Sequence, residues 1–134
     1  MKLKQKLLHP EFQQQLRVLA AKVPGTAQYW LNHRSELEWQ VCEQGIPALF
    51  ITLSSNDLHW GDLKELYGKS RTADMRESVK NDPFTAVTYF LVKWREFKTT
   101  FLYRELGVVS HFAKFEFQGR GSIHVHLLAW HPCT

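Results

Sequence analysis

The sequence predicts an α+β domain, in which helices pack on one face of a small antiparallel β-sheet. Residues 114–130 alternate in polarity on either side of a glycine-containing loop, a pattern typical of a β-hairpin. Residues 47–54 form a further apolar segment of strand length. Residues 83–106 carry an apolar stripe at helical spacing, so we expect one long helix to cover one face of a three-stranded sheet.

Length and composition are those of an ordinary globular domain. The chain has 134 residues, of which 44% are hydrophobic and 22% charged, enough for a buried core. The net charge of +4 slightly favours a polyanionic partner. No apolar run is long enough to span a bilayer and the N-terminus lacks a cleavable signal, so we expect no membrane partner. Cys42 and Cys133 are predicted to be reduced thiols of a nuclear or otherwise intracellular protein.

Two helices are predicted before the sheet, and they form an N-terminal helical segment over residues 1–45. The first covers residues 9–22, with Pro10 in its first turn. The second runs from a cap at Thr26 to about residue 44, where Gly45 is the expected stop. The core then spans residues 46–134.

The strand at residues 47–54 is followed by a loop with candidate DNA-binding side chains. Thr52 and Ser54 share a strand face, although polar strand residues that merely face solvent are equally common. His59 and Trp60 lie in the next loop, where Trp60 is suited either to stack on a base or to anchor the loop in the core. Short helices are predicted over residues 62–67 and 72–80.

The long helix over residues 83–106 is the clearest element. Asp82 is a suitable N-cap, with Pro83 at the first helical position. Gly107 is expected to end the helix. The apolar stripe is predicted to be core, and its members are Phe84, Val87, Phe90, Leu91, Trp94, Phe97 and Phe101.

The hairpin at residues 114–130 places chemically active side chains on one face. Because side chains at i and i+2 of a strand share a face, His124 and His126 point the same way, as do Glu116 and Gln118 on the preceding strand. Two imidazoles with a carboxylate or an amide suit a divalent ion. A His-x-His pair alone is often accidental, but four polar groups on one face of an apolar hairpin need partners. The pattern therefore predicts a metal site.

The string from Glu116 to Trp130, EFQGRGSIHVHLLAW, resembles the histidine–hydrophobic–histidine motif of the Rep nuclease superfamily, and its Helitron branch in particular. Further stretches agree in order and spacing with the same family. They are residues 25–30, residues 47–60 and residues 81–83. The resemblance covers roughly residues 20 to 131, nearly the whole chain.

The resemblance implies a Rep-like fold with the strand at residues 47–54 in a central position, and a nuclease that nicks single-stranded DNA and transfers the strand in rolling-circle transposition. It implies a Mg or Mn ion held by His124, His126 and a third polar ligand. Glu116 is the first choice for that ligand, because a carboxylate binds a hard cation better than the amide of Gln118 does. A helicase domain is expected to follow in the parent protein. The predicted DNA contacts are Thr52, Ser54, His59, Trp60 and Arg120.

The nucleophile is the departure from the family pattern. In the family, catalytic tyrosines lie on a helix after the hairpin, whereas all four tyrosines here precede it: Tyr29, Tyr67, Tyr89 and Tyr103. We therefore expect the core to be truncated before the tyrosine helix and not to cleave DNA by itself.

Two alternatives to the nuclease reading stay open. One is a non-catalytic single-stranded nucleic-acid-binding module or transposon remnant on the same scaffold. The other is a metal-dependent enzyme of another class, for which His59 or His111 would have to supply further ligands.

Overall fold

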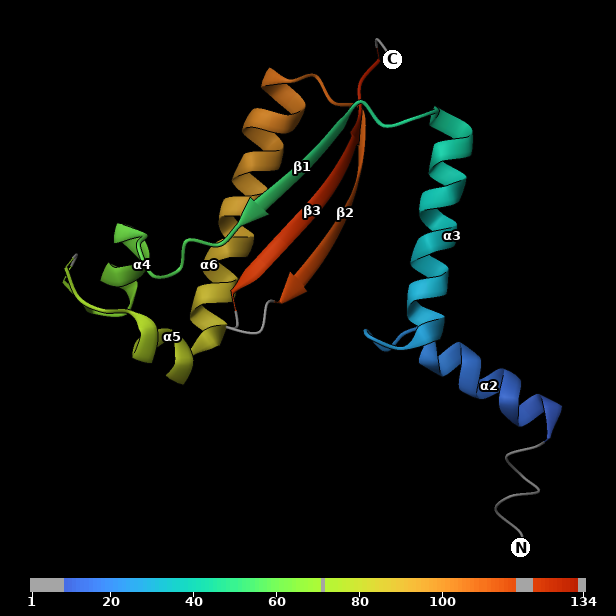
Figure 1. Cartoon of the computed structure of the whole chain (residues 1–134), viewed down its shortest axis with the longest axis horizontal. Coiled ribbons are helices and arrows are strands. Elements are labelled where there is room, and N and C mark those ends of the chain that lie inside the picture. Colours follow the sequence, from blue (N-terminus) through green and yellow to red (C-terminus); the bar gives the residue numbers. More distant parts are fainter. Residues whose placement is uncertain (1–8, 71, 118–121, 133–134) are drawn as a thin grey trace, which may run out of the picture. The chain divides into compact units, whose positions relative to one another are not determined.

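The computed structural model describes residues 9–70, 72–117 and 122–132, and they form an α+β fold with a three-stranded antiparallel sheet (Figure 1). The predicted fold class is confirmed. The chain divides into two compact units, residues 1–45 and 46–134, which are described separately. In chain order the elements are α2 (Pro10–Ala20), α3 (Ala27–Gln44), β1 (Leu49–Ser54), α4 (Gly61–Leu66), α5 (Arg76–Asn81), α6 (Pro83–Glu96), η1 (Phe97–Glu105), β2 (Ser110–Phe117) and β3 (Ile123–Trp130).

The first unit contains the two predicted helices, α2 and α3. The hydroxyl of Thr26 accepts a hydrogen bond from the N–H of Tyr29 at 3.2 Å, which makes it the N-cap of α3. Gly45 ends α3 at a φ of 78°, a left-handed conformation that favours glycine, and its N–H donates to the Val41 carbonyl. Neither helix has a buried residue, so the buried core of the described residues belongs to the second unit.

The sheet of the second unit has the order β1-β3-β2, with both neighbouring pairs antiparallel. The expectation that the strand at residues 47–54 is central is wrong, because β3 lies between β1 and β2. The side chains of β3 explain this position. Ile123, Val125, Leu127 and Ala129 are all at least 96% buried, and a strand with that much to bury gains from a neighbour on both edges.

The core lies between one face of the sheet and the helix α6 with its continuation η1 (Figure 1). Ala86, Phe90 and Trp94 are the buried residues of α6, and they follow one another at a spacing of four. The broader predicted stripe is partly wrong: Phe84, Leu91 and Phe101 are respectively 78%, 43% and 45% exposed. A single helix on a three-stranded sheet buries only the narrow face that touches the sheet, and residues one position away turn about 100° from it.

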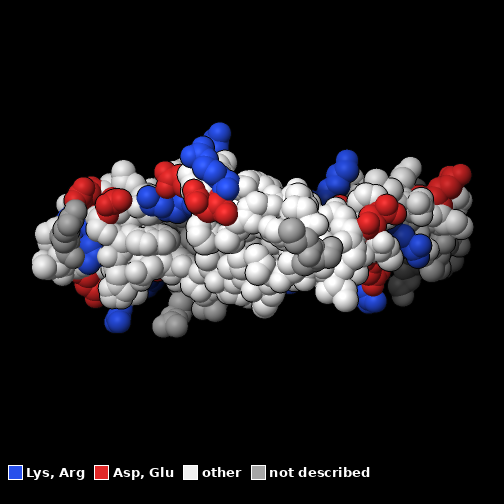
Figure 2. Space-filling view, turned by 90° about the horizontal axis from the view of Figure 1, so that it is seen from above, with Lys and Arg blue, Asp and Glu red and all other residues white. Residues whose placement is uncertain are grey.

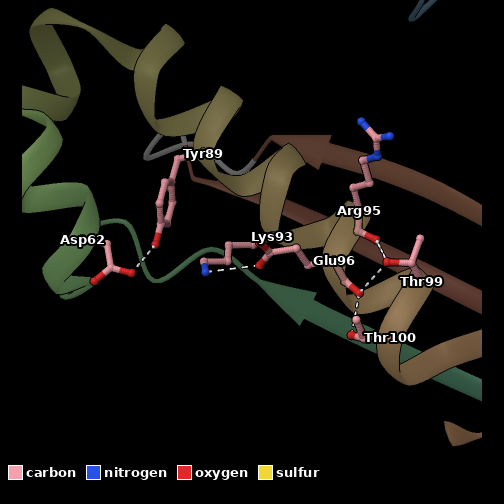
Figure 3. A network of polar contacts seen from close by, with 7 residues as sticks. All are labelled: Asp62, Tyr89, Lys93, Arg95, Glu96, Thr99 and Thr100. Atoms are coloured by element: carbon pink, nitrogen blue, oxygen red, sulfur yellow. Dashed lines mark hydrogen bonds and ion pairs between the residues drawn. The ribbon is translucent and has the colours of Figure 1, made fainter. Parts of the chain in front are cut away.

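The long predicted helix continues without a break but changes type at Phe97, where the α-helix becomes a π-helix. Two threonines lie at this junction, and Figure 3 shows their hydroxyls against the backbone. Thr99 donates to the carbonyls of Arg95 and Glu96 at 3.0 and 3.1 Å, and Thr100 donates to that of Glu96 at 2.7 Å. Such bonds offer carbonyls an alternative to the regular α-helical partner, which is a physical reason for the local change of pitch.

The short helices α4 and α5 are fixed to α6 by a smaller buried cluster of Leu63, Met75 and Ala86. A polar contact supports it, since the hydroxyl of Tyr89 on α6 donates to the Asp62 carboxylate on α4 at 3.2 Å (Figure 3). This attachment holds the loop that follows β1 against the helical layer.

Candidate functional site

The sheet face that α6 does not cover, here called the open face, collects polar side chains from all three strands. Cross-strand pairing sets them in two rows. Across the sheet the rows are Thr52, His126 and Lys114, and Ser54, His124 and Glu116. The predicted parity of the hairpin is confirmed for the described residues, because Glu116 pairs with His124 while Val125 and Leu127 face the core.

Each histidine of the open face has a hydroxyl partner on β1. The Thr52 hydroxyl is 3.1 Å from Nδ1 of His126, and the Ser54 hydroxyl is 2.8 Å from Nδ1 of His124. In both rings Nδ1 is therefore engaged within the sheet. In each ring, Nε2 is the nitrogen that these hydroxyls leave for another partner.

Glu116 places a carboxylate beside this pair of rings. One of its oxygens lies 3.3 Å from Nε2 of His126, and the other lies 2.6 Å from the Lys114 ammonium. The Lys114 ammonium, and to a smaller extent His126, lowers the pKa of the Glu116 carboxyl below its usual value. The carboxylate is thus kept ionised, as a ligand to a hard cation must be.

The donor types fit a divalent ion, since imidazole nitrogens and a carboxylate oxygen lie on one strand-to-strand surface. However, the described side chains do not form a complete set of metal ligands. Among residues 9–70, 72–117 and 122–132, no three His, Cys, Asp or Glu side chains are grouped closely enough to hold a metal ion. Gln118, the alternative third ligand, lies outside the described residues, so its position relative to the histidines stays untested.

Two residues of the open face were missed by sequence reasoning. Lys114 shares strand parity with Glu116, and that spacing of two was the available signal. Phe50 is 69% exposed, and its ring is stacked with that of His126 at a centroid distance of 6.2 Å and an interplanar angle of 8°. An exposed aromatic ring beside the histidines adds a surface on which a base can stack.

The other predicted DNA contacts fall into different surroundings. His59 lines a hollow of about 350 Å³ together with Lys64 and Arg76. The ring of Trp60 packs against those of Tyr89 and Phe90, with centroids 5.3 and 6.4 Å away, in the manner of a loop anchor. A DNA contact by Trp60 stays a prediction.

Arg120 is the remaining predicted contact, and it lies outside the described residues. On the face drawn in Figure 2, basic and acidic side chains are interspersed and no extended basic stripe is visible.

Comparison with known proteins addresses the whole chain rather than single residues. A sequence profile described as "Helitron helicase-like domain at N-terminus" matches residues 3–129. The chain belongs to this Helitron family. No curated protein and no solved structure gives a significant match.

Within residues 46–134, the tyrosine hydroxyls of the Helitron domain contact groups away from the polar rows of the open face. Tyr67 donates to the Asp82 carbonyl, and Tyr89 donates to Asp62. The hydroxyl of Tyr103 lies 2.6 Å from Nδ1 of His111, whose place on β2 puts it on the helix-covered face with Ala113.

No helix in the described ranges is both long and apolar enough for a bilayer crossing.

Proposed function

We propose that this Helitron helicase-like domain binds single-stranded DNA on its open face and serves metal-dependent nicking and strand transfer in a rolling-circle transposase. The observation that carries the proposal is the convergence of His124, His126 and Glu116 on one sheet face, where Glu116 approaches His126 to 3.3 Å. Such a protein acts where its DNA lies, in the nucleus or elsewhere inside the cell, and a helicase domain in the same polypeptide would separate the strands.

When bound, a Mg or Mn ion would supply a Lewis acid that polarises a scissile phosphodiester. His124, His126 and Glu116 would hold it, with Gln118 as the alternative to Glu116. The chain's own residues orient the DNA. Phe50 offers an exposed ring beside His126, and His59 lines a hollow with two cationic side chains and the Asp74 carboxylate. Thr52, Ser54, Trp60 and Arg120 complete the predicted DNA surface.

Strand cleavage in this proposal requires a tyrosine hydroxyl at the open face. Tyr67, Tyr89 and Tyr103 each hold their hydroxyl against another group. Tyr29 belongs to the other unit, where its ring packs against those of Trp30 and His33. We therefore expect these 134 residues to bind DNA and metal but not to cut DNA by themselves.

A specific observation favours a second candidate, a non-catalytic single-stranded nucleic-acid-binding module. The Lys114 ammonium lies 2.6 Å from Glu116, so a cation of the protein already neutralises the carboxylate. With Phe50 exposed next to His126, the open face then serves for stacking and phosphate contact without an ion.

Manganese titration by calorimetry, with and without a single-stranded oligonucleotide, separates the two candidates. The variant is His124→Ala/His126→Ala, and the matched control is His9→Ala/His33→Ala, which removes the same number of imidazoles from the first unit. Saturable binding that only the first variant loses supports the nuclease proposal. Oligonucleotide binding without any manganese uptake in the wild type supports the binding module instead. Efficient nicking of the oligonucleotide by the wild-type chain would contradict the expected lack of cleavage.

A further inference from the structure

The hollow that contains His59 is built from three segments of the second unit, and its volume is about 350 Å³. Among the described residues, its polar lining comes from the loop after β1, from α4 and from the start of α5. These residues are His59, Lys64, Thr72, Asp74 and Arg76. The volume lies at the small end of the range for ligand pockets, which is about 300–1,000 Å³. The hollow therefore suits one small group rather than an extended ligand.

Lys64 is the unusual member of this lining. It is only 7% exposed, although lysine is almost never fully buried in proteins. A buried lysine keeps its stem in apolar surroundings, whereas its ammonium needs polar partners. A hydrogen bond from an ammonium to an anion is stronger in shielded surroundings than at an open surface. The burial of Lys64 therefore favours an anion as the occupant of the hollow.

Both cationic residues of the hollow are fixed by their neighbours along the chain. Leu63 precedes Lys64, and Met75 precedes Arg76. Leu63 and Met75 are completely buried in the cluster that joins α4 and α5 to α6. The backbone that carries the two cations is thus held in place before a ligand binds, which lowers the entropic cost of binding.

The groups of the lining match the oxygens of a phosphate. Apart from the imidazole of His59, the lining carries two cations, Lys64 and Arg76, and one carboxylate, Asp74. That carboxylate accepts a hydrogen bond from the backbone N–H of Arg76 at 3.0 Å. The hydroxyl of Thr72 adds a neutral group that can donate. Guanidinium, ammonium and hydroxyl groups are common contacts of phosphate oxygens, so their combination points to a phosphate group.

The hollow follows the end of the open face that carries the two histidines, and β1 points toward α4 (Figure 1). Ser54, which pairs with His124, is the last residue of β1, and His59 comes five positions later. Five residues span at most about 18 Å. The loop is held by a backbone bond from Ser55 to β3 and by the packing of Trp60 against α6. A single strand that crosses the open face therefore reaches the hollow within a few nucleotides.

We propose that this hollow binds a backbone phosphate of the single-stranded DNA, with Lys64 and Arg76 as its main contacts. The inference rests on the proposed function, since it adds a second point of contact for the same strand. A phosphate group reaches a protein either within a nucleic acid or as free phosphate, and the place of the hollow beside the open face favours the first source. The contact positions the strand without reading its bases.

The first test measures the binding of a fluorescent single-stranded oligonucleotide to the full chain, by anisotropy at a series of salt concentrations. We expect Lys64→Met to weaken binding about 10-fold and the more exposed Arg76→Gln to weaken it about 3-fold, whatever the base sequence. Each variant should also reduce the slope of log Kd against log salt concentration by about 0.7. Arg95→Gln is the matched control, an exposed arginine of α6 outside the lining, and it should keep the wild-type affinity and slope.

A second readout identifies the source of the phosphate. The side-chain Nε–H signal of Arg76 in ¹H–¹⁵N spectra is assigned by its loss in Arg76→Gln. The oligonucleotide should shift this signal, and inorganic phosphate should do so only at a much higher concentration. Saturation by inorganic phosphate at a lower concentration than by the oligonucleotide would assign the hollow to free phosphate and overturn the inference. An equal response to a peptide of glutamate residues would also overturn it.

Failure of the inference differs from failure of the proposed function. Wild-type affinity and salt slope in both Lys64→Met and Arg76→Gln would overturn the inference and leave the proposed function standing. Weaker binding in these two variants, with no change in Phe50→Ala, would support the hollow and contradict DNA binding on the open face. A wild-type chain that does not bind the oligonucleotide would overturn both.

Discussion

The two faces of the sheet use the same strand for opposite purposes. On the helix-covered face, the alternate residues of β3 are packed under α6 and almost fully buried, from Ile123 to Ala129. On the open face, His124 and His126 stay partly exposed and are held by hydroxyls from β1 and a carboxylate from β2. A strand of period two therefore separates stability from chemistry at adjacent positions, and each can be altered without the other.

Truncating two neighbouring leucines of β3 should give the largest difference in stability between the two faces. Leu127 is fully buried in the core, whereas Leu128 lies on the open face in the row of Phe50 and Phe112. We expect Leu127→Ala to lower the free energy of unfolding by about 3 kcal/mol, because it leaves a cavity under α6. The loss for Leu128→Ala should be about 1 kcal/mol or less. Urea denaturation measures both, and equal losses would refute the division of the sheet into two faces.

Replacing the two histidines of the open face should remove metal binding and leave the core intact. His124→Ala/His126→Ala should abolish measurable manganese uptake and change the free energy of unfolding by only about 0.5–1 kcal/mol, since both rings are partly exposed. Thermal unfolding of the variant in metal-free buffer measures the second quantity. A loss as large as that of Leu127→Ala would mean that the rings support the fold itself.

The helical layer can be tested through its N-terminus. The Asp82 carboxylate accepts from the N–H and the hydroxyl of Thr85, and these bonds lower the pKa of Asp82. Its contribution to stability is therefore present above the unfolded-state pKa of about 3.9 and is lost as the pH falls through the lower folded-state pKa. We expect Asp82→Ala to lower Tm by about 5 °C near neutral pH.

The same variant gives the pH test. The Tm difference between wild type and Asp82→Ala should shrink below about pH 4 as the carboxylate is protonated. Circular dichroism at a series of pH values measures the difference. A difference that does not depend on pH would rule out the charged cap.

The smallest expected effect concerns the ion pair of the open face. In Lys114→Met, the pKa of the Glu116 carboxyl should rise toward its usual value, because the ammonium that lowers it is gone. Stability should change little, since both side chains are more than two-fifths exposed. Carboxyl ¹³C chemical shifts followed through a pH titration give the pKa. An unchanged value would show that Lys114 and Glu116 do not interact in solution.

Local patterns in the sequence predicted those features that depend on neighbours along the chain. Alternation around the glycine loop set His124 and Glu116 on a common face, and Asp82 with Pro83 located the start of α6. The family profile over residues 3–129 likewise agrees with the resemblance read from short motifs.

Features that depend on distant segments were not predictable in the same way. Periodicity places Thr52 on a face but does not say that its partner is His126, 74 positions away, nor that β1 is an edge strand. The width of the buried stripe on α6 was predicted wrongly for a related reason. It depends on how many strands lie beneath the helix, which the helix sequence alone does not record.

The separation between β1 and β3 has a consequence for how the site comes into being. The hairpin of β2 and β3 closes over a short connection, so Glu116 and the two histidines meet at small entropic cost. The hydroxyls of Thr52 and Ser54 arrive only when segments 74 and 70 positions apart along the chain join, a slower event of high contact order. An edge strand is also among the first elements to open in local fluctuations. The site therefore forms in two steps, first the β2–β3 hairpin and then the docking of β1 on β3. In a destabilised protein, the contacts of β1 are lost before those of the hairpin.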